Sequence, residues 1–490
     1  MISAPEQVGQ EIGKMNDGQV DDLTRELCRT NLKYLCTQIL GMKDWDRCHD
    51  DLAEFLRRSE KNKKLILMPR GHLKTSIVTI GKSIQHILND PDTTILYLNA
   101  VQSNAESFLS EAKDYLTTKS LLPLLFGHFA SWKWNETSIV VRQRTRANKT
   151  PTASVAGADK ALASQHYDVI FVDDLVNRQT IGTRDQIANT RKVFSDVLDL
   201  LNPGGTLYYI GTRWDEWDIY GTIIEDFADA FDVYNVSATN NGEIDGEVVF
   251  PKKFSTSILK ELLKEKGSYE FGLQYLNRVT PRTSQHFKPP FRYWTEIPAG
   301  SAHVITVDLA ISEDDNADYT VILDTVRFPS GQWAMVEYMR GHLGVGEILE
   351  GVFKMVQKTN QPTVRVGVES VLFQKVYAHL IDGEKIKRGM RFQVIPVQQT
   401  RDKFSRIMSL QPLWEQGNWL LKQGMVEAEQ EFLSFPSGKN DDILDACEMA
   451  PRVLDSTYKV FNSKYGGAWI PQRYRDENIN KRRVQYIGNY

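Results

Sequence analysis

The chain has 490 residues, of which 41% are hydrophobic and 25% charged, with a formal net charge of −4. This length is too great for one ordinary core and predicts two domains. No apolar run approaches the roughly 20 residues that span a bilayer, and the N-terminus lacks the basic-then-apolar layout of a secretion signal. We therefore expect a protein that is made and used inside a cell, without a membrane partner.

The four cysteines show neither CxxC pairing nor partner histidines at zinc spacing, which predicts free thiols: Cys28, Cys36, Cys48 and Cys447. Because the net charge is negative, a DNA partner would have to be held by local basic surfaces and not by the overall field.

Residues 1–60 are predicted to be helical, because leucines recur near helical spacing from Leu23 to Leu40. From about Lys64 short apolar runs alternate with amphipathic stretches, as in a parallel sheet with crossover helices. The runs are Leu65–Met68, Thr94–Leu98, Val169–Val172 and Thr206–Ile210.

A second strand-rich block begins near His303, and helical patterns follow at about 401–416 and 441–454. The stretch 240–300 between the blocks contains Pro281, Pro289 and Pro290 and is where we place the domain junction. The expected divisions are a helical region at 1–60, an α/β nucleotide-binding domain at 61–285, a second α/β domain at 286–455 and a flexible basic tail at 456–490.

The apolar run Leu65–Met68 leads into a loop that suits a phosphate-binding site, because a helix pattern follows at once. Lys74 would reach the β and γ phosphates of ATP, and the Thr75 hydroxyl would bind Mg²⁺. The loop residues predicted to contact nucleotide are Arg70, Gly71, His72, Leu73, Lys74, Thr75 and Ser76. Leu73 occupies the place where glycine is expected, so a plain strand-to-helix turn remains an alternative.

Two carboxylates end the run Val169–Val172, which strengthens the nucleotide-site hypothesis. Asp173 can hold Mg²⁺ through water, and Asp174 can orient and deprotonate the attacking water. The alternative is a strand followed by an acidic helix cap. The next run ends in Gly211-Thr212-Arg213, where Thr212 is placed to sense the γ-phosphate and Arg213 is either structural or a charge-stabilising finger.

The second block has its own set of carboxylates at element ends. Asp308 ends one strand, Glu369 ends another, and Asp441 and Asp442 open a helix that also carries Asp445. In an RNase H-like fold such residues converge and hold two divalent metals about 4 Å apart. Oxygen ligands favour Mg²⁺ or Mn²⁺ over zinc. The predicted ligands are Asp308, Glu369 and Asp442, with Asp445 as a possible fourth and Asp318 as a second-layer or turn residue.

These residues together resemble the large terminase family of tailed phages, and the likeness covers nearly the whole chain. The most distinctive stretch is Lys266-Gly-Ser-Tyr-Glu-Phe-Gly-Leu-Gln-Tyr-Leu-Asn277, which resembles the segment that ends the ATPase domain in many terminases. By this resemblance Arg70 acts in cis on the γ-phosphate, and His49 lies near the adenine base. Ser164-Gln165 stands where many members carry Gly-Arg, so the resemblance does not identify the arginine that acts in trans, for which Arg178, Arg184 and Arg213 are candidates.

The resemblance implies a P-loop NTPase domain of the ASCE type followed by an RNase H-like nuclease domain. The implied function is ATP-driven translocation of double-stranded DNA into a procapsid, with metal-dependent endonucleolytic cutting of concatemeric DNA. The implied cofactors are ATP with one Mg²⁺, and two Mg²⁺ or Mn²⁺ ions in the nuclease site. The implied partners are DNA, a portal protein, a small terminase subunit and further copies in a ring of five. The implied place of action is the host cytoplasm, transiently on the procapsid portal and not in the mature virion.

Two basic segments are candidate contacts for DNA or a partner. Arg142-Gln-Arg-Thr-Arg-Ala-Asn-Lys149 is suited to sequence-independent phosphate contacts, and a solvated loop is the alternative. The tail carries Arg473, Arg475, Lys481, Arg482 and Arg483 among aromatics, and either docks on the portal, touches DNA or has no specific role.

Two other functions fit parts of the same pattern. One is a helicase-like DNA translocase whose C-terminal block is only a scaffold. The other is an assembly protein with an inactive nucleotide site, which the leucine at position 73 suggests.

Overall fold

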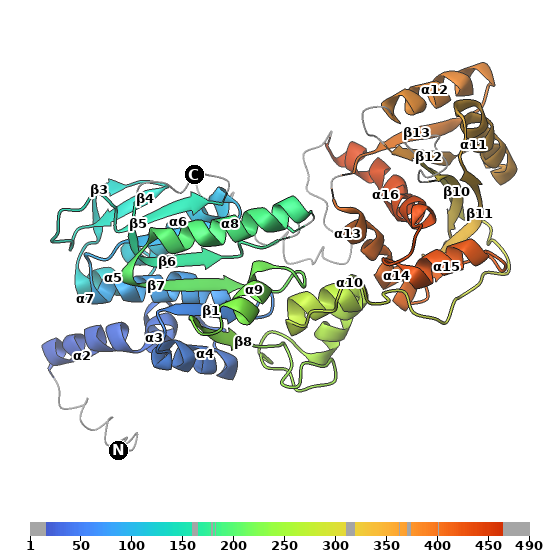
Figure 1. Cartoon of the computed structure of the whole chain (residues 1–490). Coiled ribbons are helices and arrows are strands. Elements are labelled where there is room, and N and C mark those ends of the chain that lie inside the picture. The colour runs from blue at the N-terminus through green and yellow to red at the C-terminus, as the bar shows by residue number, and fades with distance from the viewer. Residues whose placement is uncertain are drawn as a thin grey trace, which may run out of the picture. The chain divides into compact units, whose positions relative to one another are not determined.

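The computed structural model describes residues 16–158, 165–177, 180–181, 183–309, 319–361, 363–369, 374–399 and 401–463. The chain divides into two compact units, Met1–Ser284 and Gln285–Tyr490 (Figure 1). Within the described part, every helix is too short or too polar to cross a bilayer. Some sequence predictions fall outside these residues, namely those for Ser164, Arg178, Asp318, the side chain of Arg184 and the tail beyond residue 463.

The first unit is built on a mostly parallel sheet, in which eight strands are described. Their bounds are β1 (Lys63–Leu67), β2 (Ile95–Asn99), β3 (Ala130–Trp134), β4 (Ser138–Val141), β5 (Ala153–Gly157), β6 (Tyr167–Asp173), β7 (Leu201–Gly211) and β8 (Phe231–Asn235). Their order is β3-β4-β5-β2-β6-β7-β1-β8. The four apolar runs predicted as strands are the adjacent strands β2, β6, β7 and β1, because only strands covered on both faces are apolar throughout.

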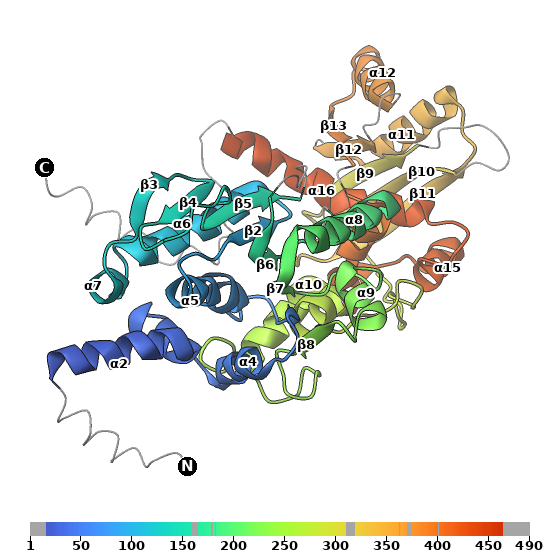
Figure 2. The same cartoon turned by 60° about the vertical axis from the view of Figure 1, so that its left-hand side comes forward.

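Successive side chains of these strands enter two different cores. Ile66 of β1 belongs to the core beneath the N-terminal helices, whereas Leu65 and Leu67 belong to the core beneath α8 (Arg184–Leu200) and α9 (Ile219–Asp226). Figure 2 shows β7 between α5 on one side and α8 on the other. The helices of the first face are α2 (Asp17–Thr30), α3 (Leu32–Tyr34), η1 (Leu35–Ile39), α4 (Arg47–Arg58), η2 (Thr75–Lys82), α5 (Ser83–Asn89), α6 (Gln102–Thr117) and α7 (Leu122–Phe126).

The last helix of the first unit is α10 (Thr256–Leu276), which contains most of the distinctive Lys266–Asn277 stretch. Gly267 interrupts it with a φ of 79°, a conformation that glycine adopts without a Cβ clash. Its C-terminal half buries Phe271 and Tyr275 in a small core with Phe250 and Phe254. This core lies against the loop between β1 and η2, because Leu73 also packs on it.

The second unit contains a mixed sheet in which six strands are described. The strands are β9 (Ala302–Asp308), β10 (Thr320–Arg327), β11 (Trp333–Gly341), β12 (Val364–Glu369), β13 (Phe392–Val397) and β14 (Trp419–Leu420). Their order is β13-β12-β9-β10-β11-β14, with β9, β12 and β13 parallel and β10 antiparallel to both of its neighbours. The carboxyl ends of β9 and β12 therefore lie side by side.

Helices cover both faces of this second sheet. One face carries α11 (Val345–Thr359) over Ile305 and Val307. The other carries α16 (Asp442–Ser463), where the Thr306 hydroxyl donates to the Ala446 carbonyl at 2.8 Å. Gly367 permits this approach, since a Cβ there would lie 2.2 Å from Cγ2 of Val453. The remaining helices are α12 (Gln374–Lys387), α13 (Lys403–Ile407), η3 (Met408–Leu410), α14 (Gln411–Glu415) and α15 (Val426–Ser434).

Candidate functional site

The loop between β1 and η2 has the backbone conformation of a tight strand-to-helix turn. Gly71 has a φ of 79° and Leu73 a φ of 59°, so two of its residues are left-handed. A left-handed non-glycine residue costs roughly 1–2 kcal/mol, so the surrounding contacts must fix Leu73 in this conformation. Its side chain packs against the cores on both sides of the loop. Lys74 immediately precedes the helical segment that begins at Thr75.

Three contacts from outside the loop hold its backbone. The Arg70 N–H donates to the Gln274 carbonyl in α10 at 3.0 Å. The Lys253 ammonium donates to the Gly71 carbonyl at 2.9 Å. The distinctive stretch at the end of the first unit thus has a physical role, because it fixes the loop through Gln274.

His49 is the third of these contacts, and its ring is fully buried. Its Nδ1 accepts from the Asp46 N–H at 2.9 Å, so Nε2 carries the proton and donates to the His72 carbonyl at 3.2 Å. Burial lowers the pKa of His49, which favours this neutral form. The structure therefore gives His49 a role in positioning the loop that was predicted to bind phosphate. The role near adenine remains a prediction.

The two carboxylates at the end of β6 lie beside the loop. The Lys74 ammonium is 3.8 Å from Oδ1 of Asp174. Oδ2 of the buried Asp173 accepts a hydrogen bond from the Thr79 hydroxyl at 2.5 Å, and Thr75 also hydrogen-bonds to this carboxylate. The predicted convergence of Lys74, Thr75, Asp173 and Asp174 is therefore present as geometry.

Electrostatics at Asp173 fit a cation site. Burial and then the neighbouring Asp174 charge raise the pKa of Asp173 to about 7, against the opposing effects of Lys74, Thr79 and Thr75. Its Oδ1 is buried and has no hydrogen-bond donor among the described residues. An uncompensated carboxylate oxygen of this kind is what Mg²⁺ prefers as a ligand.

Sequence reasoning missed two residues of this first site. The Asn99 side chain donates to the Asp173 carbonyl at 2.6 Å, and Thr79 binds the Asp173 carboxylate. Asn99 carried a readable signal, because it is the polar end of the strand next to β6. Thr79 carried none, because it lies in an apolar helical run.

Arg213 is held inside its own unit. Its Nε lies 3.0 Å from both carboxylate oxygens of Asp218, which is fully buried, and its backbone N–H donates to Oδ1 of Asn277 at 3.3 Å. Of the two roles considered for Arg213, these contacts favour the structural one. Thr212, beside it, is buried.

In the second unit, Asp308 and Glu369 end neighbouring parallel strands, in which Val307 is the register partner of Val368. Burial raises the pKa of Asp308 well above its usual range, and the charge of Asp445 and the charge and hydrogen bond of Glu369 raise it further. Three carboxylates from two strands and α16 thus share one electrostatic environment. This donor set is all oxygen, which suits Mg²⁺ or Mn²⁺.

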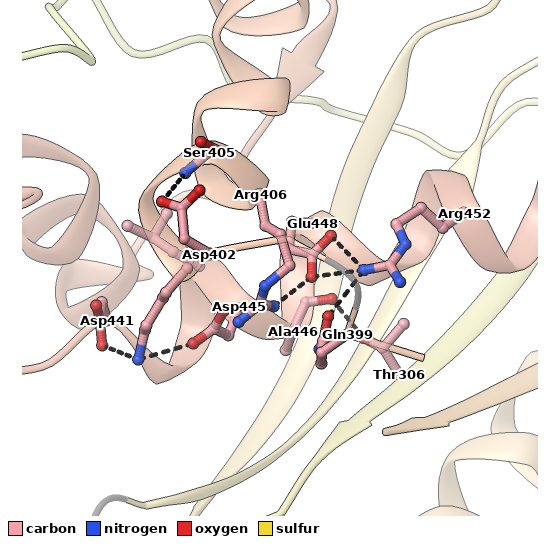
Figure 3. Close-up of polar contacts among 12 residues, drawn as sticks. Thr306, Gln399, Asp402, Ser405, Arg406, Asp441, Asp445, Ala446, Glu448 and Arg452 are labelled. Atoms are coloured by element: carbon pink, nitrogen blue, oxygen red, sulfur yellow. Dashed lines mark hydrogen bonds and ion pairs between the residues drawn. The ribbon is translucent and has the colours of Figure 1, made fainter. Parts of the chain in front are cut away.

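Basic side chains engage the α16 carboxylates of this second site. The Lys403 ammonium lies 2.5 Å from Oδ1 of Asp441 and 2.8 Å from Oδ2 of Asp445. Figure 3 shows Arg406 between Asp445 and Glu448, at 3.0 and 2.6 Å, with Arg452 on the other side of Glu448. Sequence reasoning predicted none of these cations, because an ion-pair chain across α13 and α16 leaves no local pattern.

Asp442 has a different environment from Asp445. Its Oδ2 lies 3.1 Å from Nη2 of Arg340, which also lies 3.4 Å from Oε1 of the buried Glu431. Oε2 of Glu431 in turn accepts from the Ile443 N–H at 2.9 Å. The charge of Asp445 therefore acts on Asp308, whereas Asp442 is paired with Arg340. In the described part of the chain, no three His, Cys, Asp or Glu side chains are already arranged around a metal position.

Comparison of the whole chain with known structures identifies its fold. The large terminase of the thermophilic bacteriophage D6E in crystal form 2 matches with a TM-score of 0.52 and 11% identity, over 84% of this chain and 99% of that chain. Its complex with ADP matches with a TM-score of 0.52 and 9% identity, over 84% and 100%. The predicted fold class is confirmed, because both α/β units are covered by one large terminase fold. No protein-family model and no curated protein sequence matches this chain significantly.

Proposed function

We propose that the chain is a large terminase subunit, which moves double-stranded DNA into a procapsid at the expense of ATP and cuts concatemeric DNA with divalent metal ions. One observation supports the proposal: in a chain with the fold of a large terminase, Lys74 lies beside Asp174 in one unit, and the charges of Glu369 and Asp445 act on Asp308 in the other.

In the first unit the proposed reaction is hydrolysis of ATP. Lys74 neutralises the β and γ phosphates, and Asp174 accepts the proton of the attacking water. Arg70 stabilises the charge that develops on the γ-phosphate, and Thr212 senses whether that phosphate is present. A Mg²⁺ ion held by Thr75 and Asp173 would supply further positive charge at the phosphates.

In the second unit the proposed reaction is hydrolysis of the DNA backbone. Asp308, Glu369 and Asp445 are the carboxylates that interact electrostatically. Asp442 lies with Asp445 in the first turn of α16. Two Mg²⁺ or Mn²⁺ ions held there would activate water and stabilise the leaving oxygen. Asp445 thus moves from possible fourth ligand to principal ligand in this proposal, whereas Asp442 is oriented by Arg340.

The partners proposed for this activity are those of the resemblance. They are double-stranded DNA, a portal protein, a small terminase subunit and four further copies in a ring of five, in the host cytoplasm. A trans-acting arginine from a neighbouring copy is part of this proposal. Arg178 and Arg184 are the remaining candidates, because Arg213 is paired with Asp218.

The motor is tested by ATP binding and hydrolysis with the full chain and Mg²⁺. Lys74→Ala should abolish turnover, and Lys119→Ala, which removes an exposed lysine of the same unit, should leave it unchanged. If the wild-type chain neither binds nor hydrolyses ATP, the motor is excluded and an assembly protein with an inactive nucleotide site is favoured.

The nuclease is tested by plasmid digestion with Mg²⁺ or Mn²⁺. Glu369→Ala and Asp445→Ala should abolish cutting, while Asp382→Ala, at an exposed carboxylate of the same unit, should cut like the wild type. Asp442→Ala should reduce cutting less than Asp445→Ala. If Asp308→Ala leaves every DNA-processing activity intact, the second unit is a scaffold and the helicase-like alternative holds.

A further inference from the structure

A pocket of about 670 Å³ lies at one edge of the first sheet, between the β3–β4 hairpin and the loop that follows β4. β3 is the terminal strand of the sheet, and Trp132 on it is 86% exposed. An exposed tryptophan on a sheet edge is unusual, because its large apolar surface gains most from being covered. The pocket combines this ring with Arg142, Arg144, Arg146 and Lys149.

The charge of this pocket is almost entirely positive. Among the described residues, Arg142, Arg144 and Lys149 have no ion-pair partner, and no acidic residue lines the pocket. Asp92, which does not line the pocket, lies 3.7 Å from Nε of Arg146. It also accepts hydrogen bonds from the backbone N–H groups of Thr145 and Arg146, so it anchors the loop.

Arg144 provides donors that lack partners. Its Nη1 donates to the Thr150 carbonyl at 2.8 Å, which fixes the guanidinium in the pocket wall. Its Nε and Nη2 are inaccessible to water and have no hydrogen-bond acceptor among the described residues. Within the described part of the chain the guanidinium charge is not compensated by an ion pair, so Arg144 adds to the positive potential of the pocket and favours an anionic ligand.

A fixed arginine, three exposed cations and a flat aromatic ring match the chemistry of a nucleic-acid strand. Guanidinium and ammonium groups neutralise successive phosphates, and the indole ring packs on a base or a sugar. A small anion would leave Trp132 without a role. Since the net charge of the chain is −4, contact with DNA has to come from such a local surface.

We propose that this pocket binds the phosphodiester backbone of a DNA strand, with Trp132 packed on an adjacent base or sugar. The proposal rests on the function proposed above only for the identity of the nucleic acid as DNA. It assigns sequence-independent phosphate contacts to the first unit, where a translocating motor needs them, and gives the Arg142–Lys149 run a defined ligand.

The test measures binding of the full chain to a labelled 30-base-pair duplex and a labelled 30-nucleotide strand. The assay is fluorescence anisotropy in EDTA over a range of KCl concentrations, so the nuclease is silent. The pocket variant is Arg142→Gln with Arg144→Gln and Lys149→Gln. The charge-matched control is Lys43→Gln with Arg47→Gln and Lys260→Gln, three exposed cations elsewhere in the same unit.

The pocket variant should bind DNA about tenfold or more weakly. The magnitude of the slope of log K against log salt should decrease by an amount that corresponds to about two to three lost phosphate contacts. The control should change affinity less than about twofold. Trp132→Ala should weaken binding without changing the salt slope, because it removes packing and no charge. If it weakens only single-strand binding, the ring packs on bases. If it weakens both equally, the ring packs on sugar.

Arg142→Gln with Lys149→Gln provides a second pocket variant that leaves the Arg144–Thr150 contact intact. Retained thermal midpoints and retained DNA-independent ATP hydrolysis show that each variant is folded. If both pocket variants bind DNA with the affinity and salt slope of the wild type, the proposal is overturned, and an acidic protein surface becomes the favoured ligand of the pocket. If the wild-type chain does not bind DNA at all, this result would instead contradict the proposed function itself.

Discussion

Nζ of Lys403 lies 2.8 Å from Oδ2 of Asp445, the α16 carboxylate whose charge raises the pKa of Asp308. The same ammonium also pairs with Asp441, and Arg406 pairs with the other oxygen of Asp445. The Lys403 and Arg406 side chains thus neutralise carboxylates whose oxygen atoms suit divalent metals. A divalent metal ion bound at these carboxylates, as proposed, would compete with Lys403 for the same oxygens.

Lys403→Met should therefore bind Mn²⁺ more tightly than the wild type. Removal of the competing ammonium should lower the dissociation constant by roughly tenfold, equivalent to about 1.4 kcal/mol, as measured by isothermal titration. The metal-free stability should change by only about 0–1 kcal/mol, since the lysine is more than one third exposed. Lys358→Met, which removes an exposed pair with Glu337, is the control. Weaker Mn²⁺ binding by Lys403→Met would show that the lysine supports the site.

The raised pKa of Asp173 predicts how the stability of the chain depends on pH in the absence of nucleotide and metal. Burial raises its pKa in the folded state to about 7, above its unfolded value near 3.8. A raised pKa means that the folded state binds the proton more tightly. Its stabilising contribution is therefore full below pH 4 and is lost as the pH rises through 7.

Asp173→Asn should remove this dependence, which has a maximum slope of about 1.4 kcal/mol per pH unit. In urea unfolding the variant should match the wild type near pH 4 to 5 and exceed its stability at pH 8. Asp199→Asn, at an exposed position of the same unit, should follow the wild-type profile. An equal pH slope for Asp173→Asn and the wild type would contradict the assigned burial effect.

Arg213→Ala should destabilise the first unit by about 3 kcal/mol, because it leaves the buried Asp218 charge without its counter-ion. Asp218→Asn in the same chain should restore part of the loss, since no uncompensated charge then remains. Thermal unfolding of the single and double variants measures this coupling. A stable Arg213→Ala chain that has lost ATP hydrolysis would instead assign Arg213 as a catalytic finger.

Gly211→Ala should destabilise the end of β7 by about 1–3 kcal/mol, because a Cβ at this position would lie 2.1 Å from Oη of Tyr220. Tyr220→Leu combined with Gly211→Ala should recover part of that loss by removing the ring. Urea midpoints of the two single variants, Gly211→Ala and Tyr220→Leu, and of the double variant provide the comparison. Additive losses in the double variant would show that the two positions do not interact.

Local patterns predicted the elements that carry the candidate sites. Apolar runs that end in polar residues identified β1, β6 and β7 with Lys74, Asp173 and Thr212, because strands buried on both faces have no other place for polar groups. The same reasoning identified the strand ends at Asp308 and Glu369. Parallel pairing of β9 and β12 then places these two ends together.

Partners that are distant in sequence could not be predicted in the same way. Gln274 holds the Arg70 backbone, Asp218 pairs with Arg213, and Lys403 pairs with Asp445. Each of these contacts depends on how a helix packs against its sheet, and a single polar residue in a helix does not show which face it will occupy. The choice between Asp442 and Asp445 illustrates the limit, because these two carboxylates lie only three positions apart along α16 and have different surroundings.

The sequence by itself determined which chemical groups stand at the ends of which strands, because burial forces strand interiors to be apolar and leaves the polar groups at the edge. Only the tertiary structure decided which cation each of these carboxylates meets. Ion pairs form through space between elements far apart in the chain, and their geometry is set by the packing of helices on the two sheets.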